Sequence, residues 1–375
     1  MVPYVNLAEQ NRPLTSQLLE ATERVLRHGQ YVLGPEVSAF EKRLAARLDV
    51  PHVVGVSSGT DALVMGLKVA GVEAGDEVIT VSHTFIATAS AIHLVGARVV
   101  FVDVDPRTML LDPERLESAL TSKTRAIIVV HLNGYPAEME PIARFAKAHG
   151  LRLIEDCAQS FGACYDGRAL GSWDIGCFSF HPLKVLGAVG DAGAVSVRDA
   201  NEDARLRKMR NLGLLDRDHC VFPSGNSRLD TLQAAYLLVK LELVESWRRE
   251  RAAHAAAYRA ALSGRVELPP EEDARHEATW TAFVIRHPER DELIAELSRR
   301  GVDAKIHYPL AAHQHPAFAA LELRHPLPVT EKVVNEILSL PITPEVSLEG
   351  RQRVLTALTE SLDELDRSRS SRVHA

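Results

Sequence analysis

The chain has 375 residues, 46% of them hydrophobic, and its 43 lysines and arginines against 50 aspartates and glutamates give a formal net charge of −7. This length allows about two or three domain-sized units, and the acidic balance excludes a protein that binds nucleic acid through a broad cationic surface. The first residues lack a basic segment followed by an apolar core, and no apolar stretch approaches the ~20 residues of a membrane span, so we expect a cytoplasmic protein.

Short apolar runs alternate with helical segments through the first half of the chain, and Pro141–His149 is one segment with helical spacing. This alternation predicts an α/β fold with a mostly parallel sheet covered by helices. Ligands bind such sheets at the carboxyl ends of the strands, so the residues there are the first candidates for a site. The expected strands are Val53–Val56, Glu77–Val81, Val99–Asp103, Arg125–His131, Leu151–Asp156, Ile175–Phe180 and Ala194–Val197.

The first expected strand ends in Ser58, Gly59, Thr60 and Asp61, which open a helix. Free amides at a helix N-terminus, together with the helix dipole, bind phosphate groups. Gly59 and Thr60 are therefore candidate phosphate ligands. The alternative is an ordinary N-cap, in which Thr60 or Asp61 satisfies its own helix.

Phe85, Asp156 and Gln159 follow later strands. Phe85 is either a stacking surface for a pyridine ring or a core residue. Asp156 ends an apolar run, where a carboxylate can keep the ring nitrogen of pyridoxal phosphate protonated, and Gln159 is in reach of the ring's phenolic oxygen. A metal ligand or a general base at the strand end is the alternative for Asp156.

Lys184 lies in a loop between two apolar runs, ahead of Gly187, Gly190 and Gly193. Glycines let backbone approach a ligand closely, so this setting suits a lysine that forms a Schiff base. The alternative is a solvated loop lysine. A phosphate cradle, a strand-end carboxylate and such a lysine together favour pyridoxal phosphate as the cofactor.

The second half of the chain predicts a further unit. Leu229–Leu262 has the spacing of one long helix, and a turn-rich break follows at Pro269 and Pro270. Thr279–Ile285, Asp291–Arg300 and Ser347–Arg367 then indicate a smaller α+β domain. The expected division is a large cofactor-binding domain over residues 1–250 and a small C-terminal domain over residues 251–375.

The cysteines and the C-terminal histidines do not predict a metal site. Four cysteines without CxxC spacing form no disulfide framework, and we expect reduced packing residues. The histidines lie in a proline-containing stretch without a supporting carboxylate pattern. These residues are Cys157, Cys164, Cys177 and Cys220, and His307, His313, His315 and His325.

Motifs along nearly the whole chain resemble the DegT/DnrJ/EryC1/StrS family of pyridoxal-phosphate sugar aminotransferases. They start with Tyr31, Gly34 and Pro35 and continue through SSGTDAL, SHTFIATA, EDCAQSFGA, FSFHPLK, GNSRLDTLQAAYL and IHYPL. The resemblance implies the aspartate-aminotransferase-like fold called type I and a homodimer. Leu183 and Val185 depart from relatives that carry polar residues beside the lysine.

The resemblance also implies roles for individual residues. Lys184 forms the Schiff base with the cofactor, Asp156 pairs with the pyridinium, Gln159 contacts the phenolic oxygen and Phe85 stacks on the ring. The phosphate group is bound by Gly59, Thr60 and Ser179, and by Asn226 of the neighbouring subunit. Candidate substrate residues are Tyr31, His307 and Tyr308.

We expect an aminotransferase that transfers an amino group from L-glutamate to a nucleotide-linked 3- or 4-keto-6-deoxyhexose. Alternatives within the family are a keto-cyclitol aminotransferase and a sugar dehydratase, although the dehydratases replace the lysine with histidine and this chain keeps Lys184. A nicotinamide dehydrogenase does not fit, because the glycines from Gly187 to Gly193 are spaced G-x-x-G-x-x-G after a late strand. A regulator that kept the fold would not need Lys184, Asp156 and a phosphate cradle together.

Overall fold

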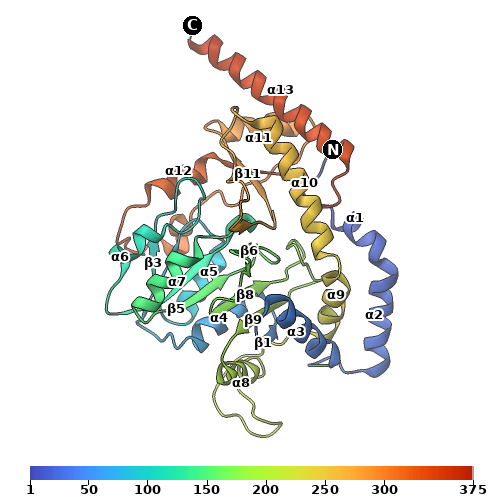
Figure 1. The fold of residues 1–375 in the computed structure, drawn as a ribbon, viewed down its shortest axis with the longest axis vertical. Coiled ribbons are helices and arrows are strands. Elements are labelled where there is room, and N and C mark those ends of the chain that lie inside the picture. The colour runs from blue at the N-terminus through green and yellow to red at the C-terminus, as the bar shows by residue number, and fades with distance from the viewer. Residues whose placement is uncertain (374–375) are drawn as a thin grey trace.

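The computed structural model describes residues 1–373, and within them a seven-stranded sheet forms the centre of the molecule (Figure 1). The strand order is β1-β9-β8-β5-β4-β2-β3. Strand β9 pairs antiparallel with both of its neighbours, and the other pairs are parallel. The strands are β1 (His52–Val56), β2 (Glu77–Val81), β3 (Arg98–Val102), β4 (Thr124–Val130), β5 (Arg152–Asp156), β8 (Ile175–Ser179) and β9 (Gly193–Val197).

Helices cover the sheet, which explains why its strands are mostly apolar. Every residue of β2 and of β9 is buried. Helices α3, α4, α5, α7 and α8 contact the strands directly. The helices are α1 (Leu7–Asn11), α2 (Thr15–His28), α3 (Pro35–Leu48), α4 (Gly59–Val69), α5 (Ile86–Leu94), α6 (Leu116–Ala119), α7 (Met139–Ala148), α8 (Ala200–Met209), α9 (Thr231–Leu241), α10 (Val244–Leu262), α11 (Arg290–Arg299), α12 (Pro328–Glu336) and α13 (Leu348–Val373).

The long helix expected over Leu229–Leu262 is in fact two helices, α9 and α10, so that prediction is wrong. The chain turns at Glu242 and Leu243 without a proline or a glycine, which is why the spacing of apolar residues gave no sign of the break. The turn lets α9 pack on α2 and α3 beside the central sheet, while α10 contacts α13. The expected domain boundary at residues 250/251 falls inside α10.

The C-terminal part, which follows α10, contains a small antiparallel sheet of β11 (Phe283–Arg286) and β12 (Ile337–Leu340). Helix α11 contacts both β12 and α13. The first residues of the chain also join this part, because the Val2 amide donates to the Gly301 carbonyl at 2.7 Å. Figure 1 places the N-terminus beside α13.

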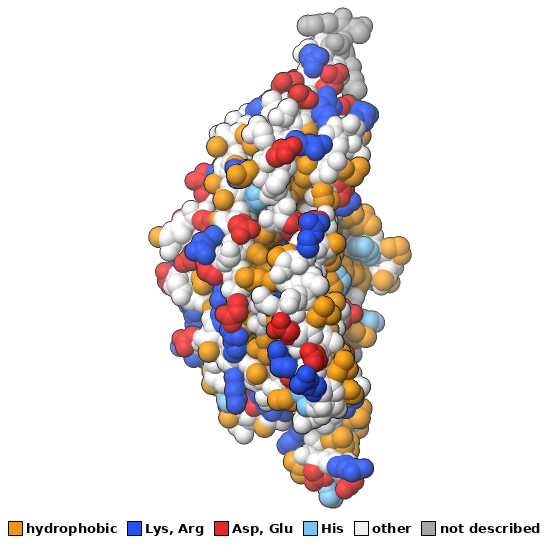
Figure 2. Space-filling model, turned by 90° about the vertical axis from the view of Figure 1, so that its right-hand side faces the viewer, with side chains coloured by type: hydrophobic (Ala, Val, Ile, Leu, Met, Phe, Trp, Pro, Cys, Tyr) orange, Lys and Arg blue, Asp and Glu red, His pale blue; other side chains and the backbone are white. Residues whose placement is uncertain are grey.

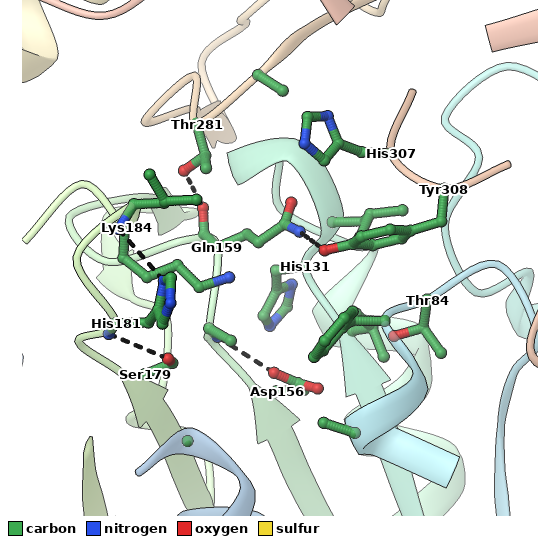
Figure 3. Close-up of a pocket in the computed structure, with 18 of the residues that line it drawn as sticks. Thr84, His131, Asp156, Gln159, Ser179, His181, Lys184, Thr281, His307 and Tyr308 are labelled. Atoms are coloured by element: carbon green, nitrogen blue, oxygen red, sulfur yellow. Dashed lines mark hydrogen bonds between the residues drawn. The ribbon is translucent and has the colours of Figure 1, made fainter. Parts of the chain in front are cut away.

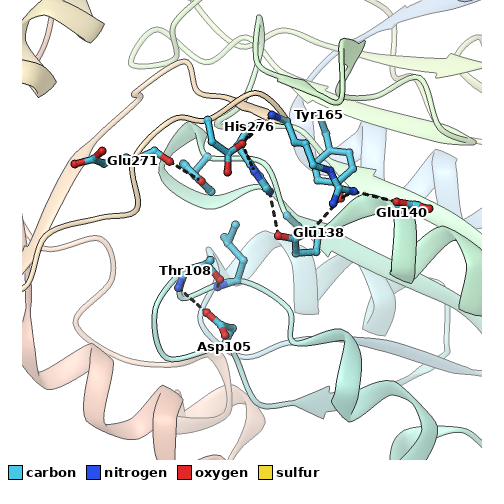
Figure 4. Close-up of polar contacts among 12 residues, drawn as sticks. Asp105, Thr108, Glu138, Glu140, Tyr165, Glu271 and His276 are labelled. Atoms are coloured by element: carbon cyan, nitrogen blue, oxygen red, sulfur yellow. Dashed lines mark hydrogen bonds and ion pairs between the residues drawn. The ribbon is translucent and has the colours of Figure 1, made fainter.

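Residues 271–282 connect the C-terminal part to the loop that follows β4 (Figure 4). Glu138 of that loop lies between His276, whose Nε2 is 3.2 Å from its carboxylate, and Tyr165, whose hydroxyl donates at 2.9 Å. His276 belongs to the short strand β10 (His276–Glu277), which pairs with β6 (Cys164–Tyr165); β6 also pairs with β7 (Arg168–Ala169). These contacts fix the C-terminal part over the carboxyl edge of the central sheet.

Two features bear on whether the protein binds nucleic acid or a membrane. On the face that Figure 2 shows, acidic and basic side chains are interspersed, with apolar side chains between them. In the part of the chain that the structure describes, no helix has both the length and the apolar composition that crossing a membrane requires.

Candidate active site

A cavity of about 410 Å³ lies at the carboxyl ends of the central strands (Figure 3). Its floor comes from residues that follow β1, β2, β4, β5 and β8, and its opposite wall from the C-terminal part. Of the predicted site residues, Tyr31 and Asn226 do not line the cavity of their own chain and are exposed. The predicted residues that line it are Gly59, Thr60, Phe85, Asp156, Gln159, Ser179, Lys184, His307 and Tyr308.

Lys184 points into this cavity from the loop between β8 and β9 (Figure 3). Its backbone amide donates to the His181 carbonyl at 2.8 Å, which closes a tight turn and directs the side chain inward. Burial lowers the pKa of the Lys184 amine, and the Asp156 carboxylate partly offsets this effect. A lowered pKa increases the fraction of neutral amine, which is the form that attacks a carbonyl carbon.

Asp156 is the last residue of β5 and is 5% exposed. Its Oδ2 accepts a hydrogen bond from the Thr88 hydroxyl at 2.8 Å, and its Oδ1 accepts one from the Ala158 amide at 3.2 Å. Burial raises the pKa of Asp156, whereas Thr88, the Ala158 amide and Lys184 act in the opposite direction. A buried carboxylate held by neutral donors is suited to pair with a cation, such as a protonated pyridine nitrogen.

Gln159 is held in one orientation. Its Oε1 accepts a hydrogen bond from the backbone amide of Asn133 at 2.8 Å. Its Nε2 therefore faces the cavity and donates to the Tyr308 hydroxyl at 3.0 Å. Burial raises the pKa of Tyr308 to about 12. The fixed amide can donate to an oxygen of a ligand in the cavity.

The start of α4 has the features of an anion site. Ser58 caps the helix by accepting a hydrogen bond from the Asp61 amide at 3.1 Å, so neither Thr60 nor Asp61 is the cap, contrary to the alternative weighed above. A Cβ at Gly59 would lie 2.5 Å from the Ser179 Cβ. The absence of a side chain at Gly59 thus lets the end of β8 approach the helix start, where free amides bind phosphate.

Phe85 is not a core residue, because its side chain is 50% exposed. It precedes α5 directly, and its ring lies 5.3 Å from that of Tyr308 at an angle of 40°. An aromatic face that stays accessible inside a cavity can stack on a planar ring.

His307 and Tyr308 form the opposite wall together with Tyr4. The His307 Nδ1 lies 2.9 Å from the Ser339 hydroxyl, and its ring is 5.3 Å from that of Tyr4. Burial, reinforced by the nearby charge of Lys184, lowers the pKa of His307 to about 4. The imidazole is therefore neutral near pH 7 and can donate or accept a hydrogen bond.

Sequence reasoning missed several residues that shape the cavity, among them Tyr4, Thr88 and Asn133. Thr84 lies just before α5 and Thr88, four positions later, in its first turn, and their hydroxyls lie 2.8 Å apart. That spacing was the available signal, because two buried hydroxyls need polar partners.

One group of potential metal ligands includes a residue that lines the cavity, His131, together with Glu155 and Cys157. Hydrogen bonds account for the carboxylate of this group. Glu155 accepts from the Gly171 amide at 2.7 Å and from the Trp173 amide at 2.8 Å, and it contacts the His131 Nε2 at 3.3 Å. The network ties β5 to the segment that leads into β8.

Comparisons with known proteins agree with this geometry. The DegT/DnrJ/EryC1/StrS aminotransferase family matches residues 13–359. A dTDP-3-amino-3,4,6-trideoxy-alpha-D-glucose transaminase of Streptomyces venezuelae is 40% identical over 373 residues, which are 98% of each chain. A pleiotropic regulatory protein of Geobacillus stearothermophilus is 40% identical over 365 residues, 96% of this chain and 98% of that protein.

A solved structure, that of S. venezuelae DesV in complex with a ketimine intermediate, superposes with a TM-score of 0.94 at 40% identity, over 96% of this chain and 98% of that chain. The prediction of an α/β fold of type I is thus confirmed. The chain belongs to the DegT/DnrJ/EryC1/StrS aminotransferase family and is an aminotransferase that uses pyridoxal phosphate.

Proposed function

We propose that this enzyme aminates a nucleotide-linked keto-deoxysugar, a 3- or 4-keto-6-deoxyhexose, with L-glutamate as the amino donor. The observation that carries the proposal is the cavity itself. On one side of the cavity Lys184, whose amine has a lowered pKa, faces the buried carboxylate of Asp156. On the other side lie the polar aromatic side chains of His307 and Tyr308, which can bind hydroxyl groups. The name of the S. venezuelae relative, a transaminase of a dTDP-linked sugar, supports this substrate class.

The proposal assigns each part of the cofactor to residues that line the cavity. Gly59, Thr60 and Ser179 would hold the phosphate group, and Phe85 would stack on the ring. Gln159 would donate to the phenolic oxygen, because its amide is oriented by Asn133. When bound, pyridoxal phosphate supplies an electron sink for a carbanion at the substrate carbon.

The chemical steps of the chain's own residues are few. Asp156 keeps the ring nitrogen protonated, which its buried, hydrogen-bonded carboxylate suits. Lys184 would hold the cofactor through its side-chain amine, and once the amino donor has displaced that amine, the amine would move the proton between the substrate carbon and the cofactor as general base and general acid. Tyr308 and the neutral His307 orient the sugar from the opposite wall.

The proposal includes a homodimer in which Asn226 of each chain completes the site of the other. Asn226 is exposed and lies outside its own cavity, although it sits in the segment that leads into α9. Tyr31 is likewise assigned to the partner's site. Large apolar side chains exposed on the loop between β8 and β9, namely Leu183 and Val189, suit an interface between copies. The proposed compartment is the cytoplasm, since four free thiols fit a reducing environment.

The test is a panel of substrates with purified enzyme, pyridoxal phosphate and L-glutamate. The panel pairs dTDP- and UDP-linked 3-keto and 4-keto sugars with keto-cyclitols, and amine formation is measured by mass spectrometry against a Lys184→Ala control. Amination of a nucleotide-linked keto-deoxysugar supports the proposal. Amination of cyclitols alone, loss of water instead of amine gain, or no amine from any substrate, as a purely regulatory protein would give, contradicts it.

A further inference from the structure

Lys240 is a buried lysine that the reaction described above does not use. It lies near the end of α9 and is 2% exposed. Its Nζ donates a hydrogen bond to the Gly187 carbonyl at 2.9 Å. Among the residues that the structure describes, no carboxylate forms an ion pair with it, and burial lowers its pKa to about 8. An unpaired buried amine is costly, so its one polar contact is the feature that needs a reason.

Gln233 contacts the same loop from the same helix. Its Oε1 accepts a hydrogen bond from the Val189 amide at 2.9 Å, and its Nε2 donates to the Val189 carbonyl at 3.3 Å. Gln233 and Lys240 are seven positions apart, which is almost two helical turns, so both side chains leave the same face of α9. Two side chains therefore bind three backbone groups of residues 187–189.

These backbone groups belong to the loop that carries Lys184. Gly187 follows Lys184 by three residues, and the two residues between them, Val185 and Leu186, are buried. On its other side the loop is closed by its own backbone, since the Ala188 amide donates to the Phe180 carbonyl at 2.8 Å. The hydrogen bonds from Gln233 and Lys240 of α9 are thus the side-chain contacts that hold residues 187–189 of the loop.

We propose that Lys240 and Gln233 are positioning residues, a clamp on α9 that holds the Lys184 loop so that the Lys184 amine stays buried and directed into the cavity. This inference rests on the proposed role of Lys184. Packing alone does not explain the two polar residues, because α9 already buries Ala234, Leu237 and Leu241. An apolar side chain at position 240 would fill the same space and leave the Gly187 carbonyl without its donor.

Lys240→Met and Gln233→Met test the clamp, because methionine keeps an unbranched side chain of similar length and removes the hydrogen bonds. The matched control is Lys68→Met, which removes an exposed lysine from α4. Small displacements of a reacting group slow the chemical step more than binding. We expect kcat to fall about 10- to 100-fold in each variant, with KM changed less than about threefold.

Two further measurements use the cofactor-free protein and do not depend on turnover. Hydrogen exchange at the amides of residues 185–189 should be at least about tenfold faster in both variants, since the loop loses side-chain contacts that hold it closed. The midpoint of the pH profile for labelling of Lys184 by an amine reagent should move to higher pH, because a loosened loop exposes the amine to water. Lys68→Met should change neither quantity.

The outcomes separate cleanly. Wild-type exchange and kcat in both variants would overturn the clamp. A higher labelling midpoint in Lys240→Met alone would also overturn it, because only a direct effect of the removed charge spares Gln233→Met. If Lys240→Met does not fold, Gln233→Met decides by itself. Failure of the proposed role of Lys184 is distinguished by Lys184→Ala, which would then aminate the substrate as the wild type does, whatever the exchange data give.

Discussion

Asp156→Asn removes one negative charge from the cavity and leaves the shape of the side chain unchanged. In the native protein this carboxylate is almost fully buried and is held by Thr88 and by the Ala158 amide, so water does not screen it. For an effective dielectric constant of about 20, two unit charges about 4 Å apart attract each other by about 4 kcal/mol. Asparagine keeps a hydrogen-bonding oxygen but does not hold the ring nitrogen protonated.

We therefore expect kcat of Asp156→Asn to fall by about 10²–10³-fold, which corresponds to about 3–4 kcal/mol in the transition state. The assay is single-turnover amination followed by mass spectrometry. Turnover within about threefold of the wild type would refute the assignment of Asp156 to the ring nitrogen. The expected loss of rate assumes a full unit charge on the buried Asp156 carboxylate.

The stability of the cofactor-free variant tests the same reasoning with the opposite sign. Burial raises the pKa of Asp156 above its value in the unfolded chain. Such a group stabilises the fold fully below the unfolded pKa of about 3.9, and this stability is lost as the pH rises through the folded pKa. The neutral asparagine of the variant would mimic the protonated group, so Asp156→Asn should melt at a higher temperature than the wild type at pH 7, and the two should converge below about pH 4. A lower melting temperature at pH 7 would contradict the predicted cost of burying this charge.

Three further variants test the rest of the site. Thr88→Val removes the hydroxyl donor to Asp156, so kcat should fall about 5- to 10-fold and the acidic limb of the pH–rate profile should move to higher pH, since the carboxylate then needs a higher pH to ionise. Gly59→Ala should weaken cofactor binding at least about tenfold in an absorbance titration, because the added methyl group fills the phosphate cradle. Mixing inactive Lys184→Ala chains with inactive Asn226→Leu chains should restore activity, since one site of each mixed dimer then carries neither change.

Each of these predictions has a control or an outcome that would contradict it. For Gly59→Ala it is Gly350→Ala, whose methyl group would meet its nearest neighbour at an ordinary 3.4 Å, and equal cofactor affinity in both would argue against the cradle. A Thr88→Val enzyme with an unmoved acidic limb would separate Thr88 from the ionisation of Asp156. Verified mixed dimers without activity would place Lys184 and Asn226 in the same site of one chain.

The strands of the central sheet were predictable because each is an apolar run between turn residues. β2 was placed at its observed bounds, and the other six within one residue at either end. The direction of β9 was not predictable, since an apolar run reads the same for parallel and antiparallel pairing. The adjacency of Asp156 and the lysine loop depends on β5 pairing with β8 across the intervening β6 and β7, which local sequence does not encode.

The sequence singled out the residues that we propose bind the cofactor, but not the residues that orient them. Asp156, Lys184 and Gly59 stand at strand ends or turns, where the sequence leaves a visible break. Gln159 gave no hint of its partners, because Asn133 and Tyr308 are 26 and 149 positions away. Lys240, within an apolar helix, contacts a carbonyl 53 positions earlier. Contacts of this kind arise from the packing of whole elements.

The two sides of the cavity come from different stretches of the chain, and this has an evolutionary consequence. The residues assigned to the cofactor follow the strands of the central sheet, whereas Tyr4, Thr281, His307 and Tyr308 come from the N-terminal segment and the C-terminal part. Substitutions in the second group can alter the shape offered to a sugar without displacing Lys184 or Asp156. A lineage can thus acquire new substrates while it inherits one unchanged chemical apparatus, and a protein engineer can vary specificity in the same few segments.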